Sequence, residues 1–258
     1  MTQPVVQIVR RAPRLAERAM KFRIGFIILA TDHTAEIDIR RLLSSDQIGT
    51  YVTRIPYANP TTPENLRAMQ PSVTAAAELI LPGDELDIVV FSCTSASAII
   101  GNDEIERAIK KAKPSAVVVT PTTAAVQAFQ ALGAERISIL APYTVETTQA
   151  MTPYFASQKV LVDRLTCLNI ADDREMARVE PHDLIAFAEE ATAPESDALF
   201  ISCTSVRSVG IAAQIEDVIS RPVITSNLAT AWACLRLCGE PSRERGNSRL
   251  FQVDAVVE

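Results

Sequence analysis

Histidine is scarce in this chain of 258 residues, which contains only His33 and His182, so a histidine-rich metal site is not expected. Three catalytic or cofactor motifs are also missing. The chain has no GxGxxG dinucleotide fingerprint, no GxxxxGK[ST] phosphate loop and no GxSxG turn that would present a nucleophilic serine. We therefore expect neither a cofactor nor a metal, and any catalysis should depend on other side chains.

Long apolar runs and basic clusters are missing from the body of the chain. No run approaches the roughly 20 apolar residues that a membrane span needs. The formal net charge of −6 argues against nucleic acid as a partner. Residues 1–22 are the exception, because they form a basic segment without the apolar centre of a secretory signal. We expect a poorly ordered tail there, with a transit peptide as the alternative.

The five cysteines do not suggest a disulfide framework, because their number is odd and the chain is long. They are Cys93, Cys167, Cys203, Cys234 and Cys238. We therefore expect a cytoplasmic protein with reduced thiols. Cys234 and Cys238 are four residues apart on one expected helical face with no histidine nearby, which favours packing over metal binding.

Short apolar segments alternate with helical patterns along the rest of the chain. We expect strands near 24–30, 50–55, 88–91, 117–120, 136–141, 160–166, 199–201 and 223–225. Helices are expected near 63–81, 103–113, 121–132, 181–192 and 228–238. This alternation predicts an α/β fold of parallel sheets covered on both faces, with ligands bound at the carboxyl ends of the strands.

The tetrapeptide SCTS occurs twice, at 92–95 and at 202–205, each time after an aspartate and an apolar run. The segments RIGFIILA and RISILA repeat in the same spacing. We therefore predict two similar Rossmann-like (flavodoxin-like) parallel-sheet lobes related by pseudo-two-fold symmetry. Lobe 1 would comprise 23–121 plus 225–258, and lobe 2 would comprise 122–224. The two cysteine turns would then face each other across one cleft.

Each cysteine is expected where a strand ends and a helix begins. Free backbone amides there, including those of Thr94, Ser95, Thr204 and Ser205, could bind an anion. The helix dipole would lower the pKa of a thiol in that position. His33 follows the first strand and is expected at the same cleft edge, with an ordinary loop histidine as the alternative.

Two facing thiols suggest isomerisation, with Cys93 and Cys203 as the catalytic pair. One thiolate could remove a proton from a carbon next to a carboxylate while the opposite thiol supplies one, as racemisation or epimerisation requires. Alternatively, one thiolate could add to a polarised double bond and permit cis–trans rotation. The structural alternative is that both cysteines are simply small buried residues.

These residues resemble the aspartate/glutamate racemase superfamily, and within it the branch of maleate isomerases and arylmalonate decarboxylases. The resemblance places Cys93 and Cys203 at the catalytic positions, Tyr143 as a donor to a substrate carboxylate and Asn169 as a site asparagine. It also places Arg207 at the arginine of the second turn. It implies a small carboxylate substrate, no cofactor and a homo-oligomer, a dimer or larger.

Two departures from that branch are visible. Maleate isomerases carry asparagine where this chain has His33, and arylmalonate decarboxylases retain only the second cysteine. Four segments, ATDHTAEID, RIPYANPTTPENLRAMQP, FSCTSASAIIG and DDREMARVEP, resemble the ectoine-utilisation (EutA) group, which implies a role in breakdown of ectoine or hydroxyectoine. A decarboxylase that uses Cys203 alone and a non-catalytic carboxylate-binding protein stay open as alternatives.

Overall fold

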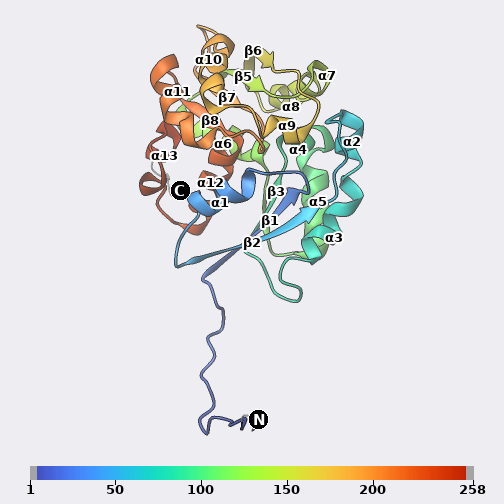
Figure 1. Ribbon diagram of the computed structural model, residues 1–258. Helices are drawn as coiled ribbons and strands as arrows, with labels where there is room; N and C mark the ends of the chain where they lie inside the picture. Colours follow the sequence, from blue (N-terminus) through green and yellow to red (C-terminus); the bar gives the residue numbers. More distant parts are fainter. Residues whose placement is uncertain (1–4, 254–258) are drawn as a thin grey trace.

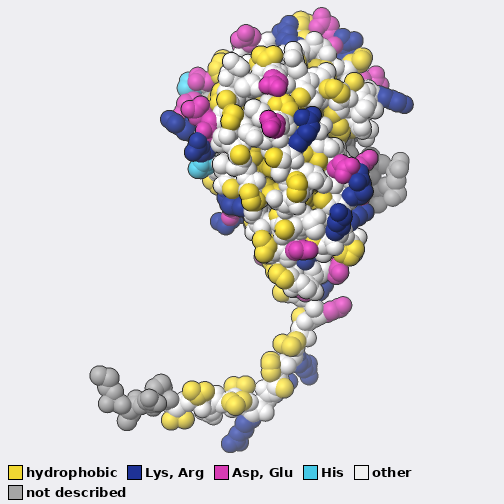
Figure 2. All heavy atoms as spheres, turned by 90° about the vertical axis from the view of Figure 1, so that its right-hand side faces the viewer, with side chains coloured by type: hydrophobic (Ala, Val, Ile, Leu, Met, Phe, Trp, Pro, Cys, Tyr) yellow, Lys and Arg dark blue, Asp and Glu magenta, His cyan; other side chains and the backbone are white. Residues whose placement is uncertain are grey.

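The computed structural model describes residues 5–253. Residues 5–21 contain no helix or strand and extend away from the body (Figures 1 and 2). Arg18 forms an ion pair with Asp87, Nη2 to Oδ2 at 2.7 Å, and so ties the end of this segment to the body. On the face that Figure 2 shows, basic and acidic side chains are interspersed.

Two four-stranded parallel sheets form the frame of the molecule. The first has the order β2-β1-β3-β4, and the second has the equivalent order β6-β5-β7-β8. The strands of the first sheet are β1 Phe22–Leu29, β2 Ile48–Ile55, β3 Ile88–Ser92 and β4 Val117–Val119. Those of the second are β5 Arg136–Ala141, β6 Leu161–Cys167, β7 Ala198–Ile201 and β8 Val223–Thr225. The predicted α/β fold of two similar parallel-sheet halves is confirmed.

The helices cover these sheets and largely follow the expected ranges. They are α1 Ala35–Leu42, α2 Pro63–Arg67, α3 Val73–Glu78, α4 Thr94–Ile100, α5 Asn102–Ala112, α6 Pro121–Leu132, α7 Val145–Gln149, α8 Thr152–Ser157, α9 Asp173–Met176, α10 Pro181–Ala191, α11 Ala212–Ile219, α12 Ser226–Cys238 and α13 Arg249–Gln252. The single helix expected over 63–81 is wrong. A short 3₁₀ turn over Gln70–Ser72 separates α2 from α3, because Pro71 lacks the amide N–H of a continuous helix and its ring clashes with the preceding turn.

Helices α6 and α12 pack against each other between the two sheets (Figure 1). Helix α12 contacts β8 of the second sheet and β4 of the first, and its Trp232 is fully buried. Cys234 and Cys238, on the same helix, are buried core residues as predicted. One apolar core therefore spans both sheets and fixes the turns at their carboxyl ends relative to each other. The division into lobes at 121–122 and 224–225 stays a prediction.

Within residues 5–253, no helix combines the length and apolar character that a membrane span requires. The same residues contain no group of three or more His, Cys, Asp or Glu side chains able to hold a metal ion.

Candidate active site

The first cysteine turn leads directly into a helix. Cys93 follows β3 with extended backbone angles (φ −150°, ψ 113°) and is the N-cap of α4. The Cys93 Sγ lies 3.8 Å from the Ser95 Oγ, and the Ser97 hydroxyl donates to the Cys93 carbonyl at 2.6 Å. The strand-to-helix turn predicted at Cys93 is thus confirmed, and the thiol lies beside the free amides of a helix N-terminus.

The second cysteine turn has a different backbone. Cys203 follows β7, but the next α-helix, α11, begins only at Ala212, so the helix expected directly after Cys203 is wrong. Tertiary hydrogen bonds hold this turn instead. The Thr204 hydroxyl donates to Asp32 Oδ2 at 3.1 Å, and the Ser205 hydroxyl donates to Asp173 Oδ1 at 2.7 Å. The Ser205 N–H donates to the Cys203 Sγ at 3.3 Å.

Ser226, the first residue of α12, joins the two turns. Its Oγ accepts a hydrogen bond from the Thr94 hydroxyl at 2.7 Å and another from the Cys203 backbone N–H at 3.0 Å. Tyr143 forms a second link, since its hydroxyl is within hydrogen-bonding reach of both Cys203 and Ser95. The structure therefore brings together Cys93, Thr94, Ser95, Tyr143, Cys203, Thr204 and Ser205.

Two buried carboxylates complete the surroundings of the second turn. Asp32 Oδ1 accepts from the backbone N–H groups of Thr34 and Ala35 at 2.7 and 2.8 Å. Asp173 Oδ2 accepts from the Thr31 hydroxyl at 2.6 Å, while its Oδ1 accepts from Ser205. Among the described residues, both carboxylates are bonded to neutral donors rather than to a cation. Burial raises the pKa of Asp32, although the Ala35 and Thr34 N–H groups act in the opposite direction, and the charge of Asp173 raises it further.

Both thiols are buried, each with only 4% of its surface exposed. Burial raises the pKa of Cys93 to about 12, although the Ala96 N–H and the Ser95 hydroxyl act in the opposite direction. Burial also raises the pKa of Cys203, and the charge of Asp173 is the next largest cause. The prediction of lowered thiol pKa values is therefore wrong, because desolvation exceeds the stabilisation that the helix N-terminus gives to a thiolate.

Tyr143 keeps its proton in this site. Burial raises its pKa well above the ordinary value, and negative charge on Cys203 or Cys93 would raise it further. The Tyr143 hydroxyl is accordingly a hydrogen-bond donor throughout the working pH range of proteins.

Two predicted site residues have exposed side chains. His33 is exposed, while its neighbours Asp32 and Thr34 are buried and bond to the second turn. Asn169 is exposed, has a left-handed backbone (φ +56°) and donates its N–H to the Tyr143 carbonyl at 3.2 Å. The roles of His33 and Asn169 in substrate binding stay predictions. Arg207 donates to the Val179 carbonyl at 3.1 Å on the exposed side of its turn.

Sequence reasoning missed Asp32, Asp173 and Ser226. Asp32 lies in the polar stretch after the first strand, and Ser226 lies in the Thr225-Ser226-Asn227 turn after the last strand. Position at the carboxyl end of a strand was therefore an available signal for both. Asp173 lies on the short helix α9, away from any strand end, and only its tertiary contacts place it beside Cys203.

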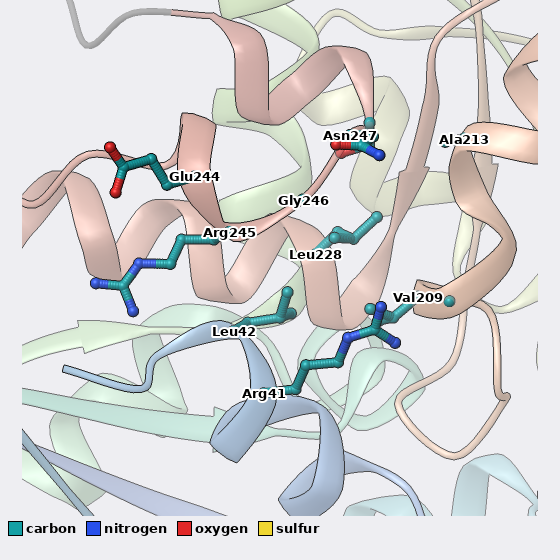
Figure 3. Close-up of a pocket in the computed structure, with 11 residues that line it drawn as sticks. Arg41, Leu42, Val209, Ala213, Leu228, Glu244, Arg245, Gly246 and Asn247 are labelled. Carbon is teal, nitrogen blue, oxygen red and sulfur yellow. The ribbon is translucent and has the colours of Figure 1, made fainter.

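A separate hollow of about 320 Å³ lies among α1, α11, α12 and the segment before α13 (Figure 3). Its lining includes Arg41, Val209, Leu228 and Asn247, and neither cysteine. In Figure 3 the Arg41 side chain runs toward Val209, whereas Glu244 and Arg245 lie at the other end of the group. This hollow is distinct from the thiol site, although Leu228 follows Ser226 by only two residues on α12.

Comparison with known proteins identifies relatives over almost the whole chain. A family described as arylmalonate decarboxylase matches residues 62–251. The maleate isomerase of Nocardia farcinica is 24% identical over 246 residues, which cover 91% of this chain and 97% of that protein.

Solved structures agree at the level of the fold. A cysteine-to-serine mutant of the Nocardia farcinica maleate cis-trans isomerase, with a covalently bound succinylcysteine intermediate, superposes with a TM-score of 0.83 and 22% identity, over 91% of this chain and 99% of that one. A cysteine-to-alanine variant of the maleate isomerase Iso of Pseudomonas putida S16, with maleate, gives a TM-score of 0.80 and 22% identity, over 90% and 98% of the two chains. The match over residues 62–251 covers most of the sequence, and the chain therefore belongs to the arylmalonate decarboxylase family.

Proposed function

We propose that this protein is a cofactor-independent isomerase, a racemase or epimerase of a small carboxylate, with Cys93 and Cys203 as its acid/base pair. The observation that carries the proposal is the junction at Ser226, where one hydroxyl accepts from Thr94 of the first turn and from the Cys203 N–H of the second. A substrate between the turns would meet one thiol on each face. This is the arrangement that inversion at carbon requires.

The surroundings of the thiols support different roles. Cys93 has the Ala96 N–H and the Ser95 hydroxyl as donors to a thiolate, so we assign it as the base. Cys203 has the charge of Asp173 beside it, which favours the protonated thiol, so we assign it as the acid. A thiolate of raised pKa is less populated, but it is a stronger base toward a carbon acid.

The proton transfers balance without a cofactor. The Cys93 thiolate takes the proton from the carbon next to the substrate carboxylate, and the C–H electron pair moves into the carboxylate to form an enediolate. The Cys203 S–H then delivers its proton to the opposite face of that carbon. The Tyr143 hydroxyl and backbone amides at the turns would stabilise the added negative charge on the carboxylate oxygens.

A maleate-type cis–trans isomerase is the second candidate, favoured by the succinylcysteine bound in the Nocardia farcinica relative. The Cys93 sulfur would add to a double bond and Cys203 would protonate the adjacent carbon. Rotation and the reverse elimination would follow. A decarboxylase would instead release carbon dioxide and need only Cys203.

The substrate we propose is ectoine, hydroxyectoine or an intermediate of their breakdown, on the resemblance of four segments to the EutA group. The test is proton NMR in D₂O. Ectoine, hydroxyectoine, aspartate and maleate are each incubated with wild type, Cys93→Ser, Cys203→Ser and the control Cys238→Ser, which changes a buried cysteine outside the site.

We expect deuterium to enter a carbon next to a carboxylate, or a cis–trans change, only when both Cys93 and Cys203 are present. Full turnover in either of these two variants would contradict the two-thiol mechanism. Carbon dioxide release that survives Cys93→Ser would favour the decarboxylase instead.

A further inference from the structure

We infer that the substrate carries a positively charged nitrogen group, an ammonium or amidinium, in addition to its carboxylate, and that Asp173 is the residue that receives this group. The inference rests on the proposed function only in taking the space between the two cysteine turns as the substrate site. It states which class of small carboxylate enters, and it disfavours plain dicarboxylates.

The geometry around Cys203 is the first argument. The two residues after this cysteine each donate a hydroxyl hydrogen bond to a different buried carboxylate, Thr204 to Asp32 and Ser205 to Asp173. These carboxylates are 3% and 4% exposed, respectively. A bound molecule beside the Cys203 thiol is therefore close to two carboxyl groups that water barely reaches, so a charge on either of them acts there with little screening.

The missing counter-charge is the second argument. Among residues 5–253, Lys113 is the one buried cation, and its Nζ donates to the carbonyls of Leu81 and Asp84 before the start of β3. Lys113 therefore lies near the start of β3, whereas Cys93 follows the end of that strand, so this cation is not beside the thiols. Arg54 approaches the Asp32 backbone, with Nη1 donating to its carbonyl at 2.9 Å, but its Nη2 pairs with Glu36 at 3.2 Å.

Asp173 is the better placed of the two carboxylates to receive a cation. Asp32 Oδ1 is held by two backbone N–H groups, which cannot turn away. The side-chain partners of Asp173 are the hydroxyls of Thr31 and Ser205, which can rotate and free an oxygen lone pair. The charge of Asp173 also raises the pKa of Cys203 and of Cys93, after burial as the main cause, so it acts on both thiols.

A dicarboxylate and a zwitterion differ in this field. A dicarboxylate such as maleate would add two negative charges next to that of Asp173, and like charges in a poorly solvated site repel. A zwitterion would give Asp173 its missing partner and leave its own carboxylate for Tyr143 and the backbone amides.

The experiment measures binding, so it does not depend on turnover. Dissociation constants for ectoine, 2,4-diaminobutyrate, maleate and succinate are determined by calorimetry on the wild-type chain, Asp173→Asn and Asp172→Asn. The last variant is the matched control, because Asp172 is the neighbouring carboxylate and pairs with Arg174 at the surface. Thermal unfolding of each variant checks that the fold is retained.

We expect the wild-type protein to bind at least one of the cationic probes about tenfold or more tightly than either dicarboxylate. Asp173→Asn should weaken the cationic probe about tenfold and strengthen maleate, and Asp172→Asn should change neither. Tighter binding of maleate than of both cationic probes to wild type would overturn the inference, as would failure of both cationic probes to bind. The wild-type ratios need no variant, so they decide the matter even if Asp173→Asn does not fold.

The two proposals fail separately. If Cys93→Ser and Cys203→Ser keep full turnover while the binding ratios favour the cationic probes, the two-thiol mechanism is wrong and the substrate class stands. If both thiols are essential and maleate binds best, the mechanism stands and the substrate class is wrong.

Discussion

The two SCTS turns have the same four residues and different surroundings. The first runs straight into α4, and its hydroxyls meet other hydroxyls, Thr94 at Ser226 and Ser95 near the Cys93 sulfur. The second has no helix behind it, and its hydroxyls meet the carboxylates of Asp32 and Asp173. A repeated motif thus sets the position of a thiol, while distant segments of the chain set its electrostatics.

In the proposed mechanism, this difference gives the two identical turns opposite roles, base at Cys93 and acid at Cys203. A thiolate is favoured where amide and hydroxyl donors surround it, and a thiol is favoured where anions do. The following predictions test that asymmetry, in order of decreasing expected effect.

Replacing either thiol should produce the largest effect. We expect Cys93→Ser and Cys203→Ser each to lower kcat/KM at least about 10³-fold, since in the proposed mechanism each removes a group that acts directly on substrate. If the reaction proceeds by addition, only Cys203→Ser should accumulate an adduct. It retains the Cys93 sulfur that forms the C–S bond, water can supply the proton to the adjacent carbon, and the variant lacks the thiolate that would remove that proton again for the reverse elimination. Intact-protein mass spectrometry after incubation with substrate measures this, and an adduct found only in Cys93→Ser would reverse the assigned roles.

Asp38 should make stability depend on pH through the second turn. The Asn227 side chain donates both to Asp38 and to the Thr204 carbonyl, so this carboxyl supports the turn. Burial raises the pKa of Asp38 from 3.8 to about 6. The protonated form is thus favoured in the folded state, so its stabilising contribution is complete below pH 3.8 and is lost as the pH rises to about 6.

This shift corresponds to about 3 kcal/mol in the free energy of unfolding. Urea unfolding at pH 4 and pH 7 should show Asp38→Asn losing that difference relative to wild type. The exposed Asp46→Asn serves as the control and should keep it. Equal pH dependence in wild type and Asp38→Asn would show that the group is charged in the folded protein at both pH values.

Ser226→Ala should loosen both turns at once. The change leaves the buried Cys203 N–H without its acceptor, which costs about 1–3 kcal/mol of stability. The matched control is Ser138→Ala, because Ser138 is also fully buried and accepts a backbone N–H, that of Ala193 at 2.8 Å. Both variants should lose stability in urea, but only Ser226→Ala should also lower kcat. Equal kcat in the two variants would argue that the junction does not position the thiols.

Asp173→Asn should affect the two thiols unequally. Removing the negative charge lowers the pKa of both, and the effect is greater at Cys203, where Asp173 is the second cause after burial. At pH 9 we expect iodoacetamide to modify Cys203 about tenfold faster than in wild type and Cys93 less so, as followed by peptide mass spectrometry. Asp172→Asn should leave both rates unchanged. An equal increase at both cysteines would remove the electrostatic distinction between the turns.

Most of the strands and helices could be predicted from the sequence, because apolar runs and capping residues are local signals. Every strand expected from apolar runs is present, and α6 runs from Pro121 to a left-handed Gly133 as its capping residues indicate. The helix predicted over 63–81 is interrupted at Pro71, a residue whose effect on a helix is itself a local signal. The helix expected directly after Cys203 is absent for another reason. The Thr204 hydroxyl bonds to Asp32, which is 172 positions away in the sequence, and the Ser205 hydroxyl bonds to Asp173, which is 32 positions away. No local pattern encodes these contacts.

The chemistry of the site was less predictable than its position. The repeat identified both thiols and Tyr143 came from family resemblance, but the sign of the thiol pKa shifts was wrong. A pKa in this site depends on how completely the surrounding segments exclude water, and no local pattern encodes that exclusion. The charge of Asp173 beside Cys203 is likewise a property of the folded chain alone.

The place of Ser226 in the chain also bears on biosynthesis. Its hydroxyl joins Thr94, 132 positions earlier, to Cys203, 23 positions earlier, so the last long helix completes a site whose thiols were synthesised well before it. A nascent chain that has emerged only as far as β8 holds both cysteines without the group that joins them. The two turns are therefore joined late, and an incomplete chain has both thiols without the packing that buries them.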